Sequence, residues 1–322
     1  MSGKKPNFIY YIENFARYLY PKFLCRLRLS RILSKVGKRE DLEYIFDRVN
    51  YYNKLDNRYS LENKGISIKD FKYSKIKGSS AHFFDTYEYT RFFPVTDTFS
   101  FVFGDVMHIP SVPSIVKSRP IAGDNRNSIV LKLGKCRHFV FVKDKIPFRQ
   151  KDNKIIFYAD MIGKPHRIDF MRKYFTHPEC ICGSIKDHES VPKEWMVKKI
   201  SIKKHLEHKF ILALEGKDVA TNLKWIMSSN SLAVMPRPKY ETWFMEGRLI
   251  PDFHYVEIRN DYSDLFERMH YYIEHHDEAE QIIKNANEYI AQFRKKKRER
   301  IISLMVLQKY FNKIVTHPST NP

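Results

Sequence analysis

Polar side chains that suit nucleotide binding gather in residues 209–265 of this chain. They follow short apolar runs or open helical segments, as Glu215 does after the run 210–214. In parallel α/β sheets ligands bind at these positions, because strand carboxyl ends and helix amino ends meet at one edge of the sheet. Cations and amides hold phosphate oxygens there, and carboxylates accept hydrogen bonds from sugar hydroxyls. The polar set comprises Glu215, Lys217, Asp218, Thr221, Asn222, Lys224, Arg237 and Glu241.

Alternating strands and helices are predicted to position this set. Apolar runs of strand length occur at 210–214, 231–235 and 254–258, and the helical segment 219–227 lies between the first two, with Asp218 as its N-cap. Prolines 236 and 238 end the second run, since neither a helix nor a central strand tolerates them. This alternation is typical of a parallel α/β sheet.

The rest of the chain predicts more than one domain. At 322 residues it suits two medium domains, and the charged, proline-containing run 143–154 has the composition of a linker. After it come a buried strand at 155–159, a helix at 168–174 and an irregular loop at 176–200. We expect an amino-terminal α/β domain over 1–150, a second α/β domain over 151–300, and a carboxy-terminal helix in 301–322 that packs back on the first.

A net charge of +20 limits the candidate partners to nucleic acid, an anionic membrane surface or a phosphorylated substrate. The segment 21–39, PKFLCRLRLSRILSKVGKR, is basic and carries an apolar stripe. Such a helix can lie on an anionic membrane, or it can pack on its own domain with solvated cations. Both interpretations stay open. The glycine spacing excludes both a Gly-x-Gly-x-x-Gly dinucleotide loop and a P-loop.

Metal and disulfide frameworks are not indicated. The four cysteines are too few for a disulfide scaffold, and Cys180-Ile-Cys182 near His177 lacks the second ligand pair of a zinc site. No two aspartates stand two residues apart, so the chain has no Asp-x-Asp motif for a divalent cation. We expect no metal cofactor and a phosphate site made of lysines, arginines and amides. We also expect no signal peptide and no run of about 18 apolar residues that would span a membrane, and hence a cytoplasmic protein.

Three ordered motifs carry a family resemblance. They are Lys217-Asp218-x-x-x-Asn222-x-Lys224, then Tyr240-Glu241-x-Trp-Phe, then Leu249-x-Pro-x-x-His-Tyr-Val. Within residues 209–265 this order resembles glycosyltransferase family 90, which includes LpsA-like lipopolysaccharide glycosyltransferases and protein O-glucosyltransferases. The resemblance implies a GT-B fold, in which two Rossmann-like domains face each other across a cleft. It also implies inverting sugar transfer from a UDP-sugar.

The resemblance implies roles for particular residues. The general base is an aspartate of the amino-terminal half, for which Asp97 in Thr-Asp-Thr-Phe is favoured, with Asp105 in Phe-Gly-Asp-Val as its rival. Either carboxylate is equally compatible with a turn or capping role. Lys117 and Arg119, on the loop that follows, are candidates for contacting a phosphorylated acceptor.

On the donor side, Lys224 stands where the family has an arginine that reaches the diphosphate, and Glu241 matches a glutamate suited to ribose hydroxyls. The family has Phe-Arg-Gly where this chain has Phe157-Tyr-Ala, so the arginine that contacts the phosphate in the family is missing here. Arg167 or Lys164, a few residues further on, could replace it.

The expected reaction is metal-independent transfer of a hexose or pentose to a lipopolysaccharide or lipooligosaccharide core. Its partners would be a UDP-sugar, a phosphorylated glycolipid and the anionic inner face of the inner membrane, without nucleic acid. Two alternatives stay open. One is a transferase acting on capsule or protein, and the other is a non-catalytic basic protein that binds membrane or nucleic acid.

Overall fold

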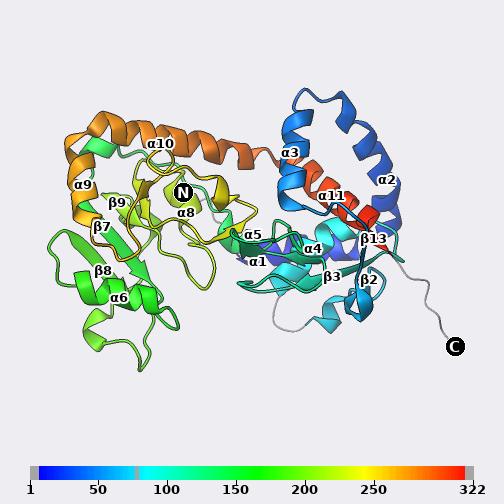
Figure 1. Cartoon of the computed structure of the whole chain (residues 1–322), viewed down its shortest axis with the longest axis horizontal. Coiled ribbons are helices and arrows are strands. Elements are labelled where there is room, and N and C mark those ends of the chain that lie inside the picture. The colour runs from blue at the N-terminus through cyan, green and yellow to red at the C-terminus, as the bar shows by residue number, and fades with distance from the viewer. Residues whose placement is uncertain (1–6, 77–79, 316–322) are drawn as a thin grey trace. The chain divides into compact units, whose positions relative to one another are not determined.

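The computed structural model describes residues 7–76 and 80–315, and it has a mixed α/β fold (Figure 1). The chain divides into two compact units. Unit 1 contains Arg137–Lys239 and Glu246–Gln292. Among the described residues, unit 2 contains 7–76, 80–136, the short segment Tyr240–Met245 and 293–315.

Unit 1 is built on a five-stranded parallel sheet with the order β12-β10-β9-β7-β8. Its central strands β9 and β10 are buried at every position, which is why both appear in the sequence as unbroken apolar runs. The predicted parallel α/β arrangement of this stretch is therefore confirmed. The strands are β7 (Asp152–Ala159), β8 (Cys180–Ser184), β9 (His208–Leu212), β10 (Leu232–Met235) and β12 (Val256–Glu257).

The connections of this sheet reverse direction between two neighbouring strands. From β7 the chain passes through α6 (Pro165–Tyr174) to β8 on one side. From β9 it passes through α8 (Leu223–Ile226) to β10 on the other side. A crevice forms outside the carboxyl ends of two strands whose connections diverge in this way. The remaining helices of unit 1 are α7 (Ile202–His205), α9 (Leu265–Glu274) and α10 (His276–Ala291).

Two sequence-based expectations for unit 1 are corrected. The region 176–200 is not wholly irregular, because it contains β8. Gly183 is required in that strand, since a Cβ there would lie 2.5 Å from Cγ1 of Val197. The predicted helix 219–227 shortens to the single turn of α8, whose N-cap is Asn222 rather than Asp218.

Unit 2 has a smaller mixed sheet with the order β2-β3-β4-β6. Strands β3 (Thr98–Val102), β4 (Ser114–Val116) and β6 (Ser128–Val130) are parallel, and β2 (Ile66–Ser67) is antiparallel to β3. Two pairs complete the strands: β5 (Ser118–Pro120) with β11 (Tyr240–Thr242), and β1 (Tyr59–Ser60) with β13 (Ile314–Val315).

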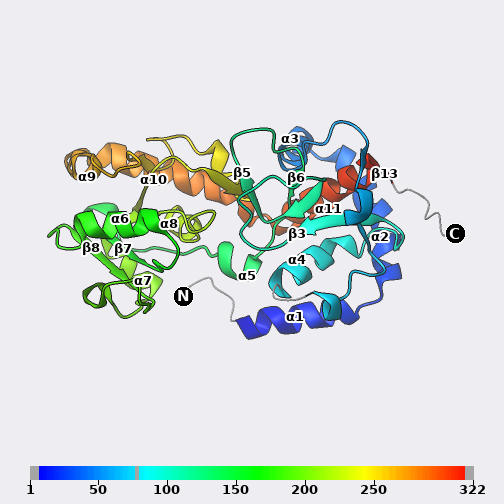
Figure 2. The same cartoon turned by 60° about the horizontal axis from the view of Figure 1, so that its bottom comes forward.

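Helices surround this sheet, and Figure 2 shows α1 (Asn7–Leu19) alongside α4 (Ser80–Thr90). Helix α3 (Leu42–Tyr52) packs on α11 (Lys296–Lys313) through a buried ion pair of 2.5 Å between Arg48 and Glu299. Trp243 Nε1 donates to the same carboxylate at 2.6 Å. The other two helices are α2 (Lys22–Ser34) and α5 (Lys135–His138). No helix within the described ranges is long and apolar enough to cross a bilayer.

Candidate functional site

A cavity of about 570 Å³ opens in unit 1 at the point where the connections diverge. Its floor contains the carboxyl ends of β7 at Ala159 and of β9 at Leu212. Asp160 and Leu214, which lie just beyond these strand ends, also line it. This is the position at which doubly wound sheets bind their ligands. Apolar strand residues form the base, while polar side chains converge from the surrounding loops. The polar lining comprises Arg137, Asp160, Arg167, Lys199, Ser201, His205, Thr221 and Asn222.

Arg167 joins the two strand ends below the cavity. It is only 9% exposed, and its guanidinium donates to Asp160 O at 2.9 Å, Leu214 O at 2.7 Å and Glu215 O at 2.8 Å. Burial lowers the pKa of Arg167 to about 10, so the side chain stays charged at neutral pH. Because these acceptors are carbonyl oxygens, the hydrogen bonds leave the positive charge beside the cavity unneutralised.

Asp160 orders the loop between β7 and α6. Its carboxylate accepts from Ile162 N at 3.0 Å and pairs with Lys186 at 2.8 Å and Lys164 at 3.4 Å. Burial opposes ionisation, but the hydrogen bond from Lys186 and the Ile162 amide bring the pKa of Asp160 below its usual value. Gly163 follows with a φ of +66°, a left-handed conformation that favours glycine at this turn.

The amino end of α8 supplies Thr221 and Asn222. Asn222 lies within reach of the strand, and its Nδ2 donates to Leu212 O at 3.0 Å. Further polar groups of the lining come from the start of α7. There Ser201 is the N-cap, and its side chain accepts a hydrogen bond from Lys204 N. His205 approaches Trp225 edge-on, with ring centroids 5.6 Å apart, and burial lowers its pKa, so its imidazole is neutral at pH 7.

Sequence reasoning missed the part of the lining contributed by Arg137, Lys199, Ser201 and His205. Residues 176–200 lack the apolar periodicity of a strand or helix, so the sequence gives no element that would place Lys199 and its neighbours at a site. Ser201 followed by Ile-Lys-Lys-His is an N-cap pattern that marks the helix start. No local pattern marks Arg137, because its place at the cavity depends on tertiary packing.

Comparisons with known proteins give a family and a relative for this chain. The family described as "Glycosyl transferase family 90" matches residues 137–322, beginning where unit 1 begins. The O-glucosyltransferase LpsA of Dichelobacter nodosus is 41% identical over 268 residues, covering 83% of each chain. This chain belongs to glycosyltransferase family 90. The family resemblance of the sequence is thereby confirmed, and the protein is a glycosyltransferase.

Some of the donor residues predicted for this family 90 enzyme meet at the cavity. Arg167, Thr221 and Asn222 all line it. Lys164 lies beside it at the N-cap of α6, where its Nζ donates to Ile162 O at 3.0 Å. The loop after β9 carries two more, Lys217 and Asp218. Lys217 is exposed and Asp218 is 3% exposed, and neither is part of the lining.

Lys224 and Glu241, the residues matched to the diphosphate and ribose contacts of the family, are both buried. Lys224 is fully buried and pairs with Glu246 at 2.5 Å. Glu241 is 2% exposed in β11 of unit 2 and accepts from Arg119 Nε at 2.7 Å. Both side chains are therefore engaged inside their own units. Contact with the donor by either residue stays a prediction.

The two cations predicted to meet the acceptor differ in environment. Arg119 is fully buried, and besides Glu241 its guanidinium donates to Tyr51 O at 2.7 Å and Ser128 O at 3.1 Å. Its hydrogen bonds hold β5, β6 and α3 together. Lys117 is also buried but pairs with Asp105, whose side chain is 44% exposed. Asp105 is thus more exposed than Lys117 or Arg119, and an acceptor could reach its carboxylate more easily than either cation.

The two candidate bases lie at opposite ends of β3. Asp97 directly precedes the strand, whereas Asp105 follows its carboxyl end, next to Lys117 at the end of β4. Burial raises the pKa of Asp97 to about 6. No hydrogen bond or ion pair from another described residue reaches its carboxylate. Within residues 7–76 and 80–315 no cluster of His, Cys, Asp and Glu is arranged to hold a metal ion.

Proposed function

We propose that this glycosyltransferase transfers a sugar from a UDP-sugar, with inversion and without a metal, to a lipopolysaccharide or lipooligosaccharide core. The observation that carries the proposal is the polar cavity between the ends of β7 and β9. Its location in a family 90 chain that is 41% identical to an O-glucosyltransferase LpsA supports a nucleotide sugar as its ligand. UDP-glucose is accordingly the first donor to test.

The lining suits a diphosphate that leaves with extra negative charge. Arg137, Arg167 and Lys199 bring three cations to the cavity, against the single carboxylate of Asp160. Preorganised cations in a concave site stabilise such a leaving group as charge develops on it. Thr221 and Asn222 offer hydroxyl and amide groups for phosphate or sugar oxygens. The volume falls within the range of about 300–1,000 Å³ that is usual for small-ligand sites.

In the proposed reaction, an acceptor hydroxyl oxygen attacks the anomeric carbon from the face opposite UDP. A carboxylate base removes the hydroxyl proton, the bond between the anomeric carbon and the diphosphate oxygen breaks, and UDP leaves with the electron pair. Attack from the opposite face inverts the anomeric configuration. Neutralisation of UDP by lysines and arginines replaces the role that a divalent cation has in other transferases.

We assign the base to Asp105 rather than to Asp97. Asp105 stands at the carboxyl edge of the parallel strands of unit 2, where ligands of such sheets bind, and its carboxylate is exposed beside Lys117. Asp97 has the pKa of a suitable base but lies at the amino edge. The GT-B arrangement and action at the inner face of the inner membrane belong to the same proposal.

The test is an assay of the purified enzyme with UDP-glucose, UDP-galactose and UDP-xylose and a truncated lipooligosaccharide, without and with EDTA. We expect UDP release and a matching mass gain of the acceptor for one donor, unchanged by EDTA, and a product anomer opposite to the donor by NMR. Calorimetry with UDP is the control for the donor site. Absence of binding by any uridine nucleotide would refute the proposal, and sugar transfer to capsule or protein only would correct the acceptor.

A further inference from the structure

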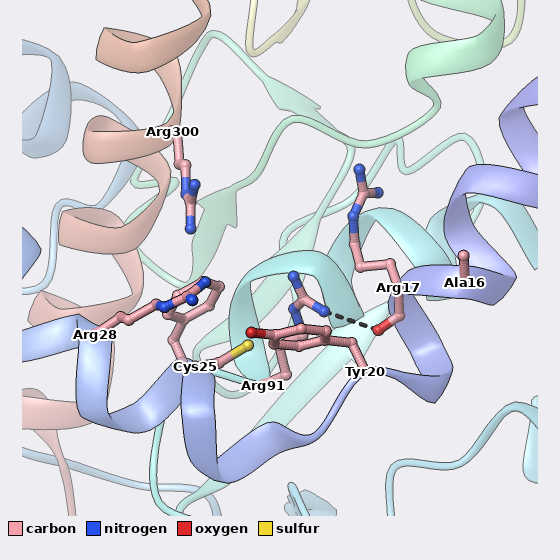
Figure 3. A pocket seen from close by; sticks show the side chains of 8 residues that line it. Ala16, Arg17, Tyr20, Cys25, Arg28, Arg91 and Arg300 are labelled. Atoms are coloured by element: carbon pink, nitrogen blue, oxygen red, sulfur yellow. Dashed lines mark hydrogen bonds between the residues drawn. The ribbon is translucent and has the colours of Figure 1, made fainter.

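A second cavity, of about 280 Å³, lies in unit 2 and is lined by four arginines (Figure 3). Arg17 comes from α1, Arg28 from α2, Arg91 from the turn after α4, and Arg300 from α11. The side chains of Arg28, Arg91 and Arg300 point toward a common space beside the ring of Tyr20. The two consecutive helices α1 and α2, the turn after α4 and the distant helix α11 thus place guanidinium groups around one hollow.

Three of these charges have no carboxylate partner in the part of the chain that the structure describes. Arg17 pairs with Glu88 at 2.9 Å. Arg91 donates instead to backbone carbonyls, Arg17 O at 2.8 Å and Glu88 O at 3.3 Å. Arg28 lies 5.9 Å from the ring centroid of Tyr20, and Arg300 lies 5.1 Å from that of Phe92. The hollow therefore concentrates uncompensated positive charge.

This arrangement matches a phosphate group. Burial lowers the pKa of Arg91, and the nearby Arg17 lowers it further, so an anion in the hollow would relieve both unfavourable effects. Guanidinium groups bind phosphate oxygens through pairs of parallel hydrogen bonds, which a single lysine cannot supply. Its volume of about 280 Å³ accommodates a phosphate group together with part of the molecule that carries it. A phosphate ester fits these properties better than a carboxylate-rich protein surface.

Exposed apolar side chains lie on the two helices that carry Arg17 and Arg28, and they indicate the source of the phosphate. On α1, the residues Phe8, Ile12, Phe15 and Leu19 share one helix face and are 44–80% exposed. On α2, Phe23 and Leu27 are 55% and 73% exposed. Leu19 and Leu27 directly precede Tyr20 and Arg28, which line the hollow. A surface that combines bare apolar residues with arginines suits the interface of a bilayer.

We propose that this hollow binds the phosphate of an anionic lipid and that the exposed faces of α1 and α2 enter the same membrane surface. A nucleic acid would satisfy the arginines but would leave the leucines and phenylalanines in water. Free phosphate would do the same. The proposal extends the suggested action on a membrane-borne acceptor, and it specifies which surface of the enzyme meets the lipid.

The experiment is co-sedimentation with phosphatidylcholine vesicles that contain or lack phosphatidic acid, with neither donor nor acceptor present. The double variant Arg28→Ala/Arg300→Ala removes the two exposed arginines of the hollow. The matched control Lys154→Ala/Lys284→Ala removes two exposed lysines of unit 1 that line neither cavity. A third variant, Leu19→Ser/Leu27→Ser, removes apolar contact. Circular dichroism verifies that each variant is folded.

We expect the parent to bind only the anionic vesicles. The arginine variant should lose about 10–30-fold in partitioning, the effect of two membrane-facing cations, and the control should lose much less. The leucine variant should also lose binding. An equal loss in the arginine variant and the lysine control would overturn the proposal. So would retention of binding by the leucine variant, or preferential binding of inorganic phosphate or duplex DNA over vesicles.

This outcome is separable from the proposed function. UDP binding, measured by calorimetry on the same variants, should equal that of the parent. Loss of vesicle binding with intact UDP binding therefore concerns the lipid site alone. Failure of the parent to bind any uridine nucleotide concerns the donor site alone.

Discussion

At the scale of single residues, the buried cations Lys224 and Arg119 are held by carboxylates from other segments of the chain. Lys224 pairs with Glu246, 22 residues away, and Arg119 pairs with Glu241, 122 residues away. Neither pairing follows from local spacing, because both depend on how distant segments fold together. Thr221 and Asn222 were predictable because they follow a strand end and lie near a helix start, which local pattern reveals, whereas Arg167 was identified only through the family resemblance.

The base assignment predicts that Asp105→Asn lowers turnover by about 10²-fold or more, the usual effect of losing a general base. The amide keeps the size of the side chain but cannot take the proton of the acceptor hydroxyl. UDP binding should remain as in the parent, because Asp105 lies in unit 2 and not at the cavity. Steady-state kinetics and calorimetry measure the two effects. Asp97→Asn is the control, and the reverse ranking of the two variants would assign the base to Asp97.

The pKa of Asp97 predicts a pH-dependent stability difference. Its folded-state pKa, about 6, is raised above the ordinary value of 3.8 by burial, so the folded protein holds this proton more tightly than the unfolded chain. The carboxyl therefore favours folding below pH 4, and this contribution is lost as pH rises to 6. Asp97→Asn removes the titration. Its free energy of unfolding, from urea denaturation, should gain about 1–2 kcal/mol relative to the parent between pH 4 and pH 7. A constant difference would show that Asp97 does not titrate in this range.

Burial of the Lys224–Glu246 pair predicts a large stability effect. Lys224→Ala leaves the Glu246 carboxylate buried without its ammonium partner and should reduce the free energy of unfolding by about 3–5 kcal/mol. The double variant Lys224→Met/Glu246→Leu removes both charges and should recover most of that loss. Urea denaturation measures both. A folded, equally stable Lys224→Ala variant that binds UDP weakly would instead support direct contact with the diphosphate.

At the scale of elements, apolar patterning predicted the sheet of unit 1 because its strands are buried on both faces. It placed β10 within one residue of its observed bounds and identified the carboxyl half of β7. It missed β8, where Cys-Ile-Cys-Gly-Ser has the composition of a turn, and where glycine is needed for the close approach of Val197. The strand order, and with it the place where the connections diverge, came only from the structure, because pairing joins residues far apart in sequence.

The cavity at the ends of β7 and β9, where the chain connections diverge, predicts which cations bind the donor. Arg137→Ala and Lys199→Ala should each weaken UDP binding by about 1–3 kcal/mol, the contribution of a charge-assisted hydrogen bond. Both side chains are exposed at the cavity rim, so stability should change little. Lys203→Ala, on the exposed side of α7 and outside the lining, is the matched control. Calorimetry with UDP measures all three, and equal losses would indicate a general charge effect in place of a defined diphosphate site.

At the scale of the whole molecule, the net charge of +20 predicts how substrate recognition depends on salt. A phosphorylated acceptor is attracted by the positive field, and mobile ions screen that field over about 10 Å at 0.1 M ionic strength. Raising NaCl from about 0.05 to 0.5 M should therefore increase the KM for a phosphorylated lipooligosaccharide several-fold. The same acceptor treated with phosphatase should show a higher KM at low salt and a much smaller increase. Initial rates at saturating donor measure both. If the KM values of the two acceptors rise equally with salt, the net positive charge of the protein does not contribute to recognition of the acceptor phosphates. The charge would then act at the donor cavity or at the membrane surface.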